Sequence, residues 1–376
     1  MFSAVDPYPE MAQLRARGSI VPYRDGDRPS YFVAGWNEVL RVLRDVTTFS
    51  TDFSLEALDP LVGSSSLLED QSADRAAQRR LAASFFSERA LRARFLDAIS
   101  ELAWEYCRPI VCRGHGDLWS ELAVPLPEAV LCQVMGLEAD GSQQLRIWIH
   151  DTLTAARAMT ARSADDAWVH EHIARLLRER RRSPGPGFIS ELAQLPHDRP
   201  GEVDSAVATV KLMLTAGVET VQCSIGNLLF AVLTHPDQLE AVRTNELARS
   251  AAIEESLRWQ APVILTVRTA VRPSILGGVP IPRGSSLYVL LASANRDERR
   301  FLQPDDYLLD RQDGAHVSFG YGLHACVGAG LARLEHAVVL RTLLDVAPEL
   351  QLTASAGTPQ ITGEVFRSPQ QLPVVC

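Results

Sequence analysis

Residues 316–340 read HVSFGYGLHACVGAGLARLEHAVVL, a cysteine in a glycine-rich segment that is followed directly by an apolar pattern with helical spacing. Gly320, Gly322 and Gly328 permit tight turns and let the backbone approach a flat ligand closely. Backbone N–H groups at the start of the helix would stabilise a thiolate on Cys326. A lone cysteine beside a helix is usually a buried structural thiol, and a metal-ligating thiolate is the alternative.

Composition limits the classes of partner that the protein can bind. The chain has 376 residues, of which 46% are hydrophobic and 22% charged, as in an ordinary soluble globular protein. Its net charge is -9, which argues against nucleic acid as the main partner, because phosphate binding needs a basic surface. The total does not exclude a local basic patch. Lys211 is the only lysine, so almost every basic residue is an arginine.

The beginning of the chain has no apolar run and no cleavage signature, and no stretch reaches about 18 uninterrupted apolar residues. We therefore expect a cytoplasmic protein without a membrane partner. The six cysteines lack the paired spacing of a zinc site, and the cytoplasm would keep them reduced.

Hydrophobic periodicity predicts a mainly α protein with small peripheral β-sheets, an α+β class. A β-rich part is expected at about 18–35, a helical core at about 74–260 and a ligand loop at 316–328. The Ser-, Asp- and Leu-rich residues 50–73 predict a long loop, and residues 203–235 predict one long buried helix. Without repeats or a low-complexity linker, residues 1–376 are expected to form a single domain.

The cysteine segment resembles the ligand loop of the bacterial, soluble cytochrome P450 family, through Phe319-Gly320-x-Gly322-x-His324-x-Cys326-x-Gly328. The resemblance implies a triangular helical prism around a buried haem b, iron protoporphyrin IX, with Cys326 as the axial ligand of the iron. Thiolate ligation favours cleavage of the O–O bond. The resemblance covers nearly the whole chain and is strongest between residues 204 and 340.

A second motif, Ala216-Gly217-Val218-Glu219-Thr220, lies inside the expected long helix. Gly, Glu and Thr together cost helix propensity and solvation, and a Thr220 hydroxyl can bond the Ala216 carbonyl and distort the helix. Close helix packing is the alternative explanation for the small pair. The segment is similar to the family's oxygen-activation motif. That similarity implies that Ala216 and Gly217 border the haem, that Thr220 steadies dioxygen and a proton-donating water, and that Glu219 relays protons.

A third pattern, Glu255-Ser256-Leu257-Arg258, places a carboxylate and a guanidinium on one helix face. Most such pairs are solvated surface contacts. The position before the cysteine loop resembles the family's buried Glu-x-x-Arg pair, and Arg311 is the candidate third member. The resemblance implies that Glu255, Arg258 and Arg311 support the haem pocket structurally.

Buried haem propionates need cationic or hydrogen-bonding partners. Arg79, Arg268 and His324 occupy the matching family positions; a surface charge is the alternative for each, and the stronger one for Arg79. The chain departs from the family at Arg75, where a histidine is usual, so the usual histidine contact is absent. The substrate pocket is expected to combine the 50–73 loop with apolar residues, which favour an apolar or aromatic substrate: Leu212, Met213, Val263, Ile264, Leu265, Val267, Val365 and Phe366.

The resemblance implies a haem-thiolate monooxygenase that uses dioxygen to oxidise a small organic substrate, in secondary metabolism. No GxGxxG motif is present at a strand-to-helix junction, so electrons are expected from a ferredoxin and its reductase, with Arg75, Arg79 and Arg80 as part of a basic docking patch. Oxidative ring coupling, dehydrogenation and action on a carrier-protein-bound substrate remain alternatives. A haem sensor or electron carrier is the non-enzyme alternative, against which the Glu219–Thr220 pair argues.

Overall fold

A computed structural model describes residues 2–25, 28–51, 73–137, 144, 145, 147–152, 154, 166–196, 201–353 and 359–376. Most of the expected 50–73 loop lies outside the described residues, and so does the side chain of Arg75. The hypotheses that placed these residues at the substrate and at a propionate therefore stay predictions.

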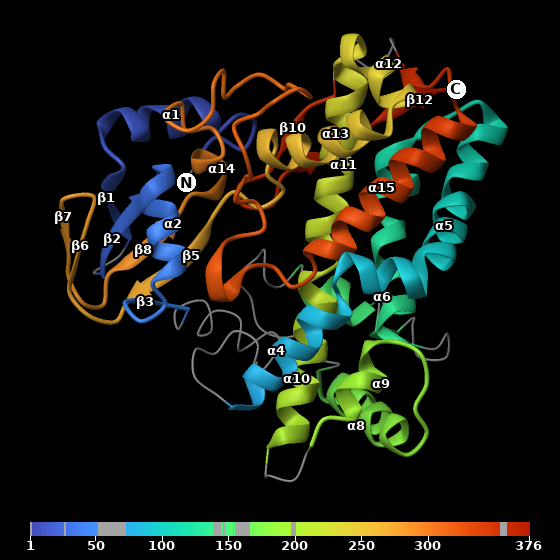
Figure 1. Ribbon diagram of the computed structural model, residues 1–376, viewed down its shortest axis with the longest axis horizontal. Coiled ribbons are helices and arrows are strands. Elements are labelled where there is room, and N and C mark those ends of the chain that lie inside the picture. The colour runs from blue at the N-terminus through green and yellow to red at the C-terminus, as the bar shows by residue number, and fades with distance from the viewer. Residues whose placement is uncertain are drawn as a thin grey trace.

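Helices form most of the described structure. Most of them gather on one side of the molecule, while the largest sheet lies on the other side together with the helices Tyr8–Arg17, Trp36–Arg44 and Leu291–Ala294 (Figure 1). The described helices are α1 (Tyr8–Arg17), α2 (Trp36–Arg44), α4 (Ala73–Phe85), α5 (Glu88–Arg113), α6 (Pro125–Met135), α8 (Asp166–Arg182), α9 (Phe188–Ala193), α10 (Glu202–Ala216), α11 (Glu219–Thr234), α12 (Pro236–Thr244), α13 (Glu246–Trp259), α14 (Leu291–Ala294) and α15 (Ala329–Val346), with the shorter turns η1 (Trp119–Ala123) and η2 (Gly322–His324). The predicted α+β class with small sheets is confirmed.

The largest sheet has the strand order β1-β2-β8-β5-β3, in which β2 and β8 are parallel and the other neighbours antiparallel. The expected β-rich segment at 18–35 forms its first hairpin. The smaller sheets are β4-β12-β9, β6-β7 and β10-β11. The strands are β1 (Ile20–Asp25), β2 (Arg28–Val33), β3 (Phe49–Ser50), β4 (His115–Asp117), β5 (Thr266–Ala270), β6 (Ser274–Leu276), β7 (Val279–Ile281), β8 (Ser286–Val289), β9 (Gln351–Leu352), β10 (Ile361–Thr362), β11 (Ser368–Pro369) and β12 (Pro373–Val375).

The predicted long helix is not continuous, and this part of the prediction was wrong. It consists of α10 and α11, which are separated at Gly217 and Val218. Two features explain the break: glycine has low helix propensity, and the Thr220 hydroxyl bonds the carbonyl of Ala216 at a distance of 2.8 Å. The helical direction continues through the break, so that residues 202–234 still run through the core (Figure 1).

Among the described residues, this 33-residue stretch, taken across the break, is the one helical segment long and apolar enough to cross a membrane. Its most apolar window is 72% buried inside the protein, as in a core helix. Lys211 illustrates the burial: its side chain is 3% exposed, pairs with Asp166 of α8 at 2.6 Å and lies over the Trp148 ring.

Helix α15 carries the cysteine loop at its N-terminal end and packs against α5, α11 and α13. A glycine makes the close approach to the segment between α4 and α5 possible, because a Cβ on Gly330 would collide with the Phe86 carbonyl oxygen. The apolar face of α15 joins the largest buried cluster, which also includes side chains of α5, α6, α10 and α11. The loop is therefore anchored to the rigid helical core.

Candidate active site

Two glycines in left-handed conformations shape the cysteine loop. Gly320 has φ +68° and Gly322 has φ +76°, a region that other L-residues rarely adopt. A Cβ on Gly322 would lie 2.9 Å from the Leu43 carbonyl oxygen, so glycine also permits the packing of the loop on α2. The loop closes when the Cys326 N–H donates to the Phe319 carbonyl at 2.8 Å.

The Cys326 side chain is accessible, although many protein atoms surround it. Burial raises the pKa of its thiol, while the backbone N–H groups of Gly328 and Ala329 and the charges of Arg79 and Arg333 act in the opposite direction. A bound metal ion would supply the further positive charge that holds the thiol deprotonated. The surroundings of Cys326 therefore suit a thiolate that ligates a metal ion.

At the break between α10 and α11, part of an otherwise buried helical stretch is accessible to solvent. Ala216 is exposed and Gly217 and Thr220 are half-buried, whereas Glu219 is 3% exposed. The predicted bond from Thr220 Oγ1 to the Ala216 carbonyl is present, at 2.8 Å. The Thr220 hydroxyl proton is therefore already used in a hydrogen bond to the backbone.

The three predicted propionate partners come from three separate elements. Arg79 of α4 donates through Nη2 to the Ala325 carbonyl at 2.7 Å, directly beside Cys326. Arg268 of β5 is 5% exposed, and its Nη1 donates to Thr266 Oγ1 at 3.0 Å and to the Val267 carbonyl at 2.8 Å. His324 lies half-buried in η2.

These groups fit a haem chemically. Cys326 offers a thiolate for iron, two arginines and one histidine offer donors for carboxylates, and the small, exposed side chain of Ala216 leaves room beside a flat ring, whereas Gly217 packs closely on Leu131. The fit rests on an accessible thiol surrounded by protein and on exposed Ala216 in a buried helix.

Glu255, Arg258 and Arg311 form one buried cluster. Glu255 accepts two hydrogen bonds from Arg258, both at 2.7 Å, and one from Arg311 Nε at 3.0 Å. Arg258 also donates to the carbonyls of Asn295, Pro304 and Asp306. Burial lowers the pKa of Arg258, and the Glu255 carboxylate opposes this effect. The cluster thus ties α13 to the segment that precedes the cysteine loop, and removal of one member would cost about 3–5 kcal/mol.

The apolar residues expected in the substrate pocket differ in their exposure. Val263 pairs with Phe366, and the Ile264 N–H donates to the Val365 carbonyl at 3.0 Å, so these two segments lie side by side. Val365 is 39% exposed, whereas Ile264 has no accessible surface and packs in a core cluster with Met11. The structure does not bring the Ile264 side chain to an open surface. The remaining residues are buried or half-buried: Leu212, Met213, Leu265 and Val267.

Sequence reasoning missed two contacts that support the loop. The Arg333 guanidinium lies 4.6 Å from the Phe319 ring centroid. Arg44 of α2 lies 4.6 Å from the Tyr321 ring centroid and donates to its hydroxyl at 2.9 Å. The spacing of Arg333, seven residues after the cysteine, indicates a helix position near the loop, but no pattern predicts what it contacts.

Comparison with known proteins covers almost the whole chain. The cytochrome P450 family model matches residues 160–346. The chain is 32% identical to cytochrome P450 monooxygenase PikC of Streptomyces venezuelae, over 94% of this chain and 87% of that protein. It is 29% identical to 6-deoxyerythronolide B hydroxylase of Saccharopolyspora erythraea, over 94% and 91%.

Among solved structures, P450BioI in complex with an acyl carrier protein ligated to hexadec-9Z-enoic acid superposes with a TM-score of 0.84. That pair shares 27% identity over 99% of this chain and 98% of the other. The sequence and structural likenesses together show that this chain belongs to the bacterial cytochrome P450 family of monooxygenases.

Proposed function

We propose that this single-domain chain holds haem b through Cys326 and oxidises a small, largely apolar molecule of secondary metabolism with dioxygen. The carrying observation is the accessible thiol of Cys326, which faces backbone N–H groups at the start of α15 and lies near Arg79. When bound, the haem supplies dioxygen activation, which thiolate ligation directs toward O–O cleavage. Relatives named for hydroxylation and polyketide biosynthesis support this setting.

The cofactor-binding residues divide into hydrogen-bond donors and residues that would lie beside the haem ring. Arg79, Arg268 and His324 would neutralise and orient the two propionates. Four residues would lie beside the haem ring: Phe319, Gly320, Ala216 and Gly217. Glu255, Arg258 and Arg311 would hold the loop in place behind them.

Thr220 and Glu219 would handle protons. Because the Thr220 hydroxyl donates to Ala216, its oxygen is left to accept a hydrogen bond. Thr220 would therefore orient a water molecule whose second proton points toward dioxygen. Buried Glu219, the preceding residue, would return protons to that water.

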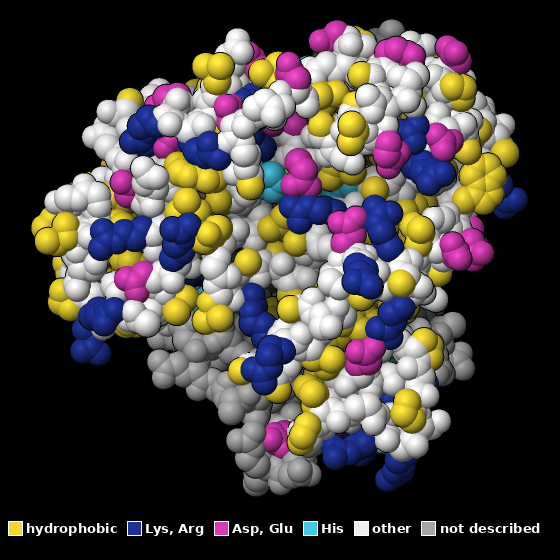
Figure 2. Space-filling view, viewed as in Figure 1, with side chains coloured by type: hydrophobic (Ala, Val, Ile, Leu, Met, Phe, Trp, Pro, Cys, Tyr) yellow, Lys and Arg dark blue, Asp and Glu magenta, His cyan; other side chains and the backbone are white. Residues whose placement is uncertain are grey.

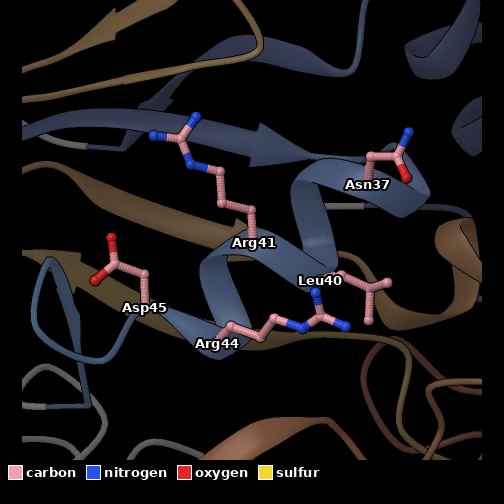
Figure 3. Close-up of a pocket in the computed structure, with 5 residues that line it drawn as sticks. All are labelled: Asn37, Leu40, Arg41, Arg44 and Asp45. Carbon is pink, nitrogen blue, oxygen red and sulfur yellow. The ribbon is translucent and has the colours of Figure 1, made fainter.

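Electrons would come from a ferredoxin and its reductase in the cytoplasm. On the face shown in Figure 2, arginines gather where Figure 1 places α4 and the beginning of α15. Arg41 and Arg44 add positive charge on α2, where they line a surface hollow of about 380 Å³ with Asn37, Leu40 and Asp45 (Figure 3). Since Arg44 also contacts Tyr321 and Arg79 contacts Ala325, this basic surface adjoins the cysteine loop and suits an acidic ferredoxin.

The substrate would lie between the α10–α11 break and two segments, Val263–Val267, in which the Ile264 side chain is buried in the core, and Val365–Phe366. Their side chains are mostly apolar, which favours an apolar or aromatic substrate. A carrier-protein-bound substrate is the second candidate, favoured by the carrier-protein complex of the structural relative. Neither nucleic acid nor membrane is proposed as a partner.

The proposal is tested on the purified protein after reconstitution with haem. Reduction and addition of carbon monoxide is expected to give the long-wavelength absorption band of a thiolate-ligated haem, and an imidazole-type spectrum would refute the assignment. Compounds that shift the haem absorption would then be tested for substrate-dependent reductant consumption, which a sensor or electron carrier would not show. Labelled dioxygen distinguishes hydroxylation, which labels the product, from coupling or dehydrogenation.

A further inference from the structure

Arg333, near the beginning of α15, donates two hydrogen bonds to one carboxylate, that of Glu254. Its Nε donates to Glu254 Oε1 at 2.7 Å and its Nη2 donates to Glu254 Oε2 at 2.9 Å. This paired geometry holds the planar guanidinium in one orientation, which a lysine could not reproduce. The guanidinium is thus fixed on the structure rather than freely solvated.

His316 supports Glu254 from the other side. Its Nε2 lies 3.3 Å from Glu254 Oε2, and its side chain is 5% exposed. Its Nδ1 accepts the Ser318 N–H at 3.1 Å, so the ring proton is assigned to Nε2, which faces the carboxylate. Glu254 therefore lies between the Arg333 guanidinium, which donates two hydrogen bonds to it, and the His316 imidazole, which is in close contact with it.

The fixed guanidinium connects directly to the cysteine loop. It lies over the Phe319 ring at 4.6 Å, and the Phe319 carbonyl accepts the Cys326 N–H at 2.8 Å. The positive charge of Arg333 is therefore held against a residue whose backbone is bonded to Cys326.

We propose that Arg333, fixed by Glu254 and His316 and stacked on Phe319, is a positioning residue that sets the reduction potential of the haem-thiolate centre. This inference rests on the proposed haem site. Reduction adds one negative charge to the iron–thiolate unit, and a fixed cation nearby stabilises the reduced form. In this role, Arg333, Glu254 and His316 would act without contacting the substrate or the haem.

The test measures the ratio of reduced to oxidised haem at a fixed solution potential, by spectroelectrochemistry on the reconstituted holoprotein. In Arg333→Gln the ratio is expected to fall about tenfold, which for one electron corresponds to a potential about 59 mV lower. Arg333→Met, whose apolar stem can still pack on Phe319, should show the same fall even if the glutamine variant folds poorly. Arg333→Lys, which keeps the charge, should recover most of the wild-type ratio.

Arg341→Gln is the matched control, because Arg341 lies on the same helix and pairs with Asp345 at 3.6 Å on an exposed surface. It should leave the ratio unchanged. An unchanged ratio in both neutral Arg333 variants, or an equal fall in Arg341→Gln, would overturn the inference while the carbon monoxide spectrum still reports a thiolate-ligated haem. Loss of that spectrum in the wild-type protein would instead overturn the proposed function itself.

Discussion

Thr220 Oγ1 donates its proton to the Ala216 carbonyl at 2.8 Å, across the two residues that interrupt the central helix. The bond fixes the rotamer of the threonine and leaves its oxygen as an acceptor. Under the proposed function, this oxygen is the atom that would accept a hydrogen bond from a water molecule.

Thr220→Ala is therefore expected to retain haem but to waste reductant. Without the acceptor, delivery of the proton loses its orientation, and more reductant ends as hydrogen peroxide, by roughly tenfold or more relative to product. Peroxide and product are measured against reductant consumed. Thr234→Ala is the control, because Thr234 makes the same bond to the carbonyl four residues back, at 2.7 Å, at the far end of α11. A fully coupled Thr220→Ala enzyme would remove Thr220 from the proton path.

Arg268→Ala is expected to weaken haem retention. The substitution would remove charge-assisted hydrogen bonds between Arg268 and a haem propionate. Such bonds are worth about 1.5–3 kcal/mol, which corresponds to a loss of roughly tenfold or more in affinity for haem. Transfer of haem to an acceptor protein measures the change. Arg272→Ala, an exposed arginine just beyond β5 that bonds Thr47 and Thr48, serves as the control. Equal haem loss rates for Arg268→Ala and wild type would exclude Arg268 as a propionate partner.

Gly322→Ala is expected to destabilise the cysteine loop for two reasons. Its φ of +76° strains any other residue, and the new Cβ would press on the Leu43 carbonyl. We expect about 1–3 kcal/mol of lost stability, together with reduced haem uptake. Gly284→Ala separates the two causes, because Gly284 has φ +84° but open space around its Cβ position. Equal effects of both substitutions on chemical denaturation would show that the Leu43 contact contributes nothing.

Acid should weaken the Glu254 network. Burial opposes ionisation of this carboxyl, but hydrogen bonds from Arg333 and His316 outweigh burial and lower its pKa to about 2, from 4.5. Because the folded-state pKa lies below the unfolded one, the stabilisation is complete above about pH 4.5 and is lost as the pH falls toward 2. Since Glu254 is 46% exposed, we expect only about 1 kcal/mol. Unfolding measured from about pH 5 to pH 3 should be less pH-dependent in Glu254→Gln, and identical slopes would contradict the assignment.

Local patterns in the sequence predicted local geometry well. The turn glycines of the cysteine loop and the Thr220–Ala216 bond each involve neighbours in sequence, so residue chemistry alone constrains them. The Ala216–Thr220 motif indicated a distortion of the central helix, but a full interruption was not predicted, because hydrophobic periodicity continues through Gly217 and Val218 even where the hydrogen-bond pattern does not.

Contacts between distant segments could not be predicted in this way. Arg44 reaches Tyr321 and Leu43 approaches Gly322 only because α2 packs on the cysteine loop. Alternation along a short strand-like run also cannot say which face is open, and for that reason Ile264 was assigned to the pocket although its side chain packs in the core. Such placements depend on tertiary packing.

The burial of Lys211 has a consequence for the exterior of the protein. Every other basic residue is an arginine, so the outward cations are guanidinium groups, apart from histidine. Guanidinium keeps its proton in alkaline buffers that would neutralise an ammonium group, and it is not a target for lysine acetylation. The proposed attraction for an acidic ferredoxin is consequently expected to persist from neutral to mildly alkaline conditions, and added salt should weaken it.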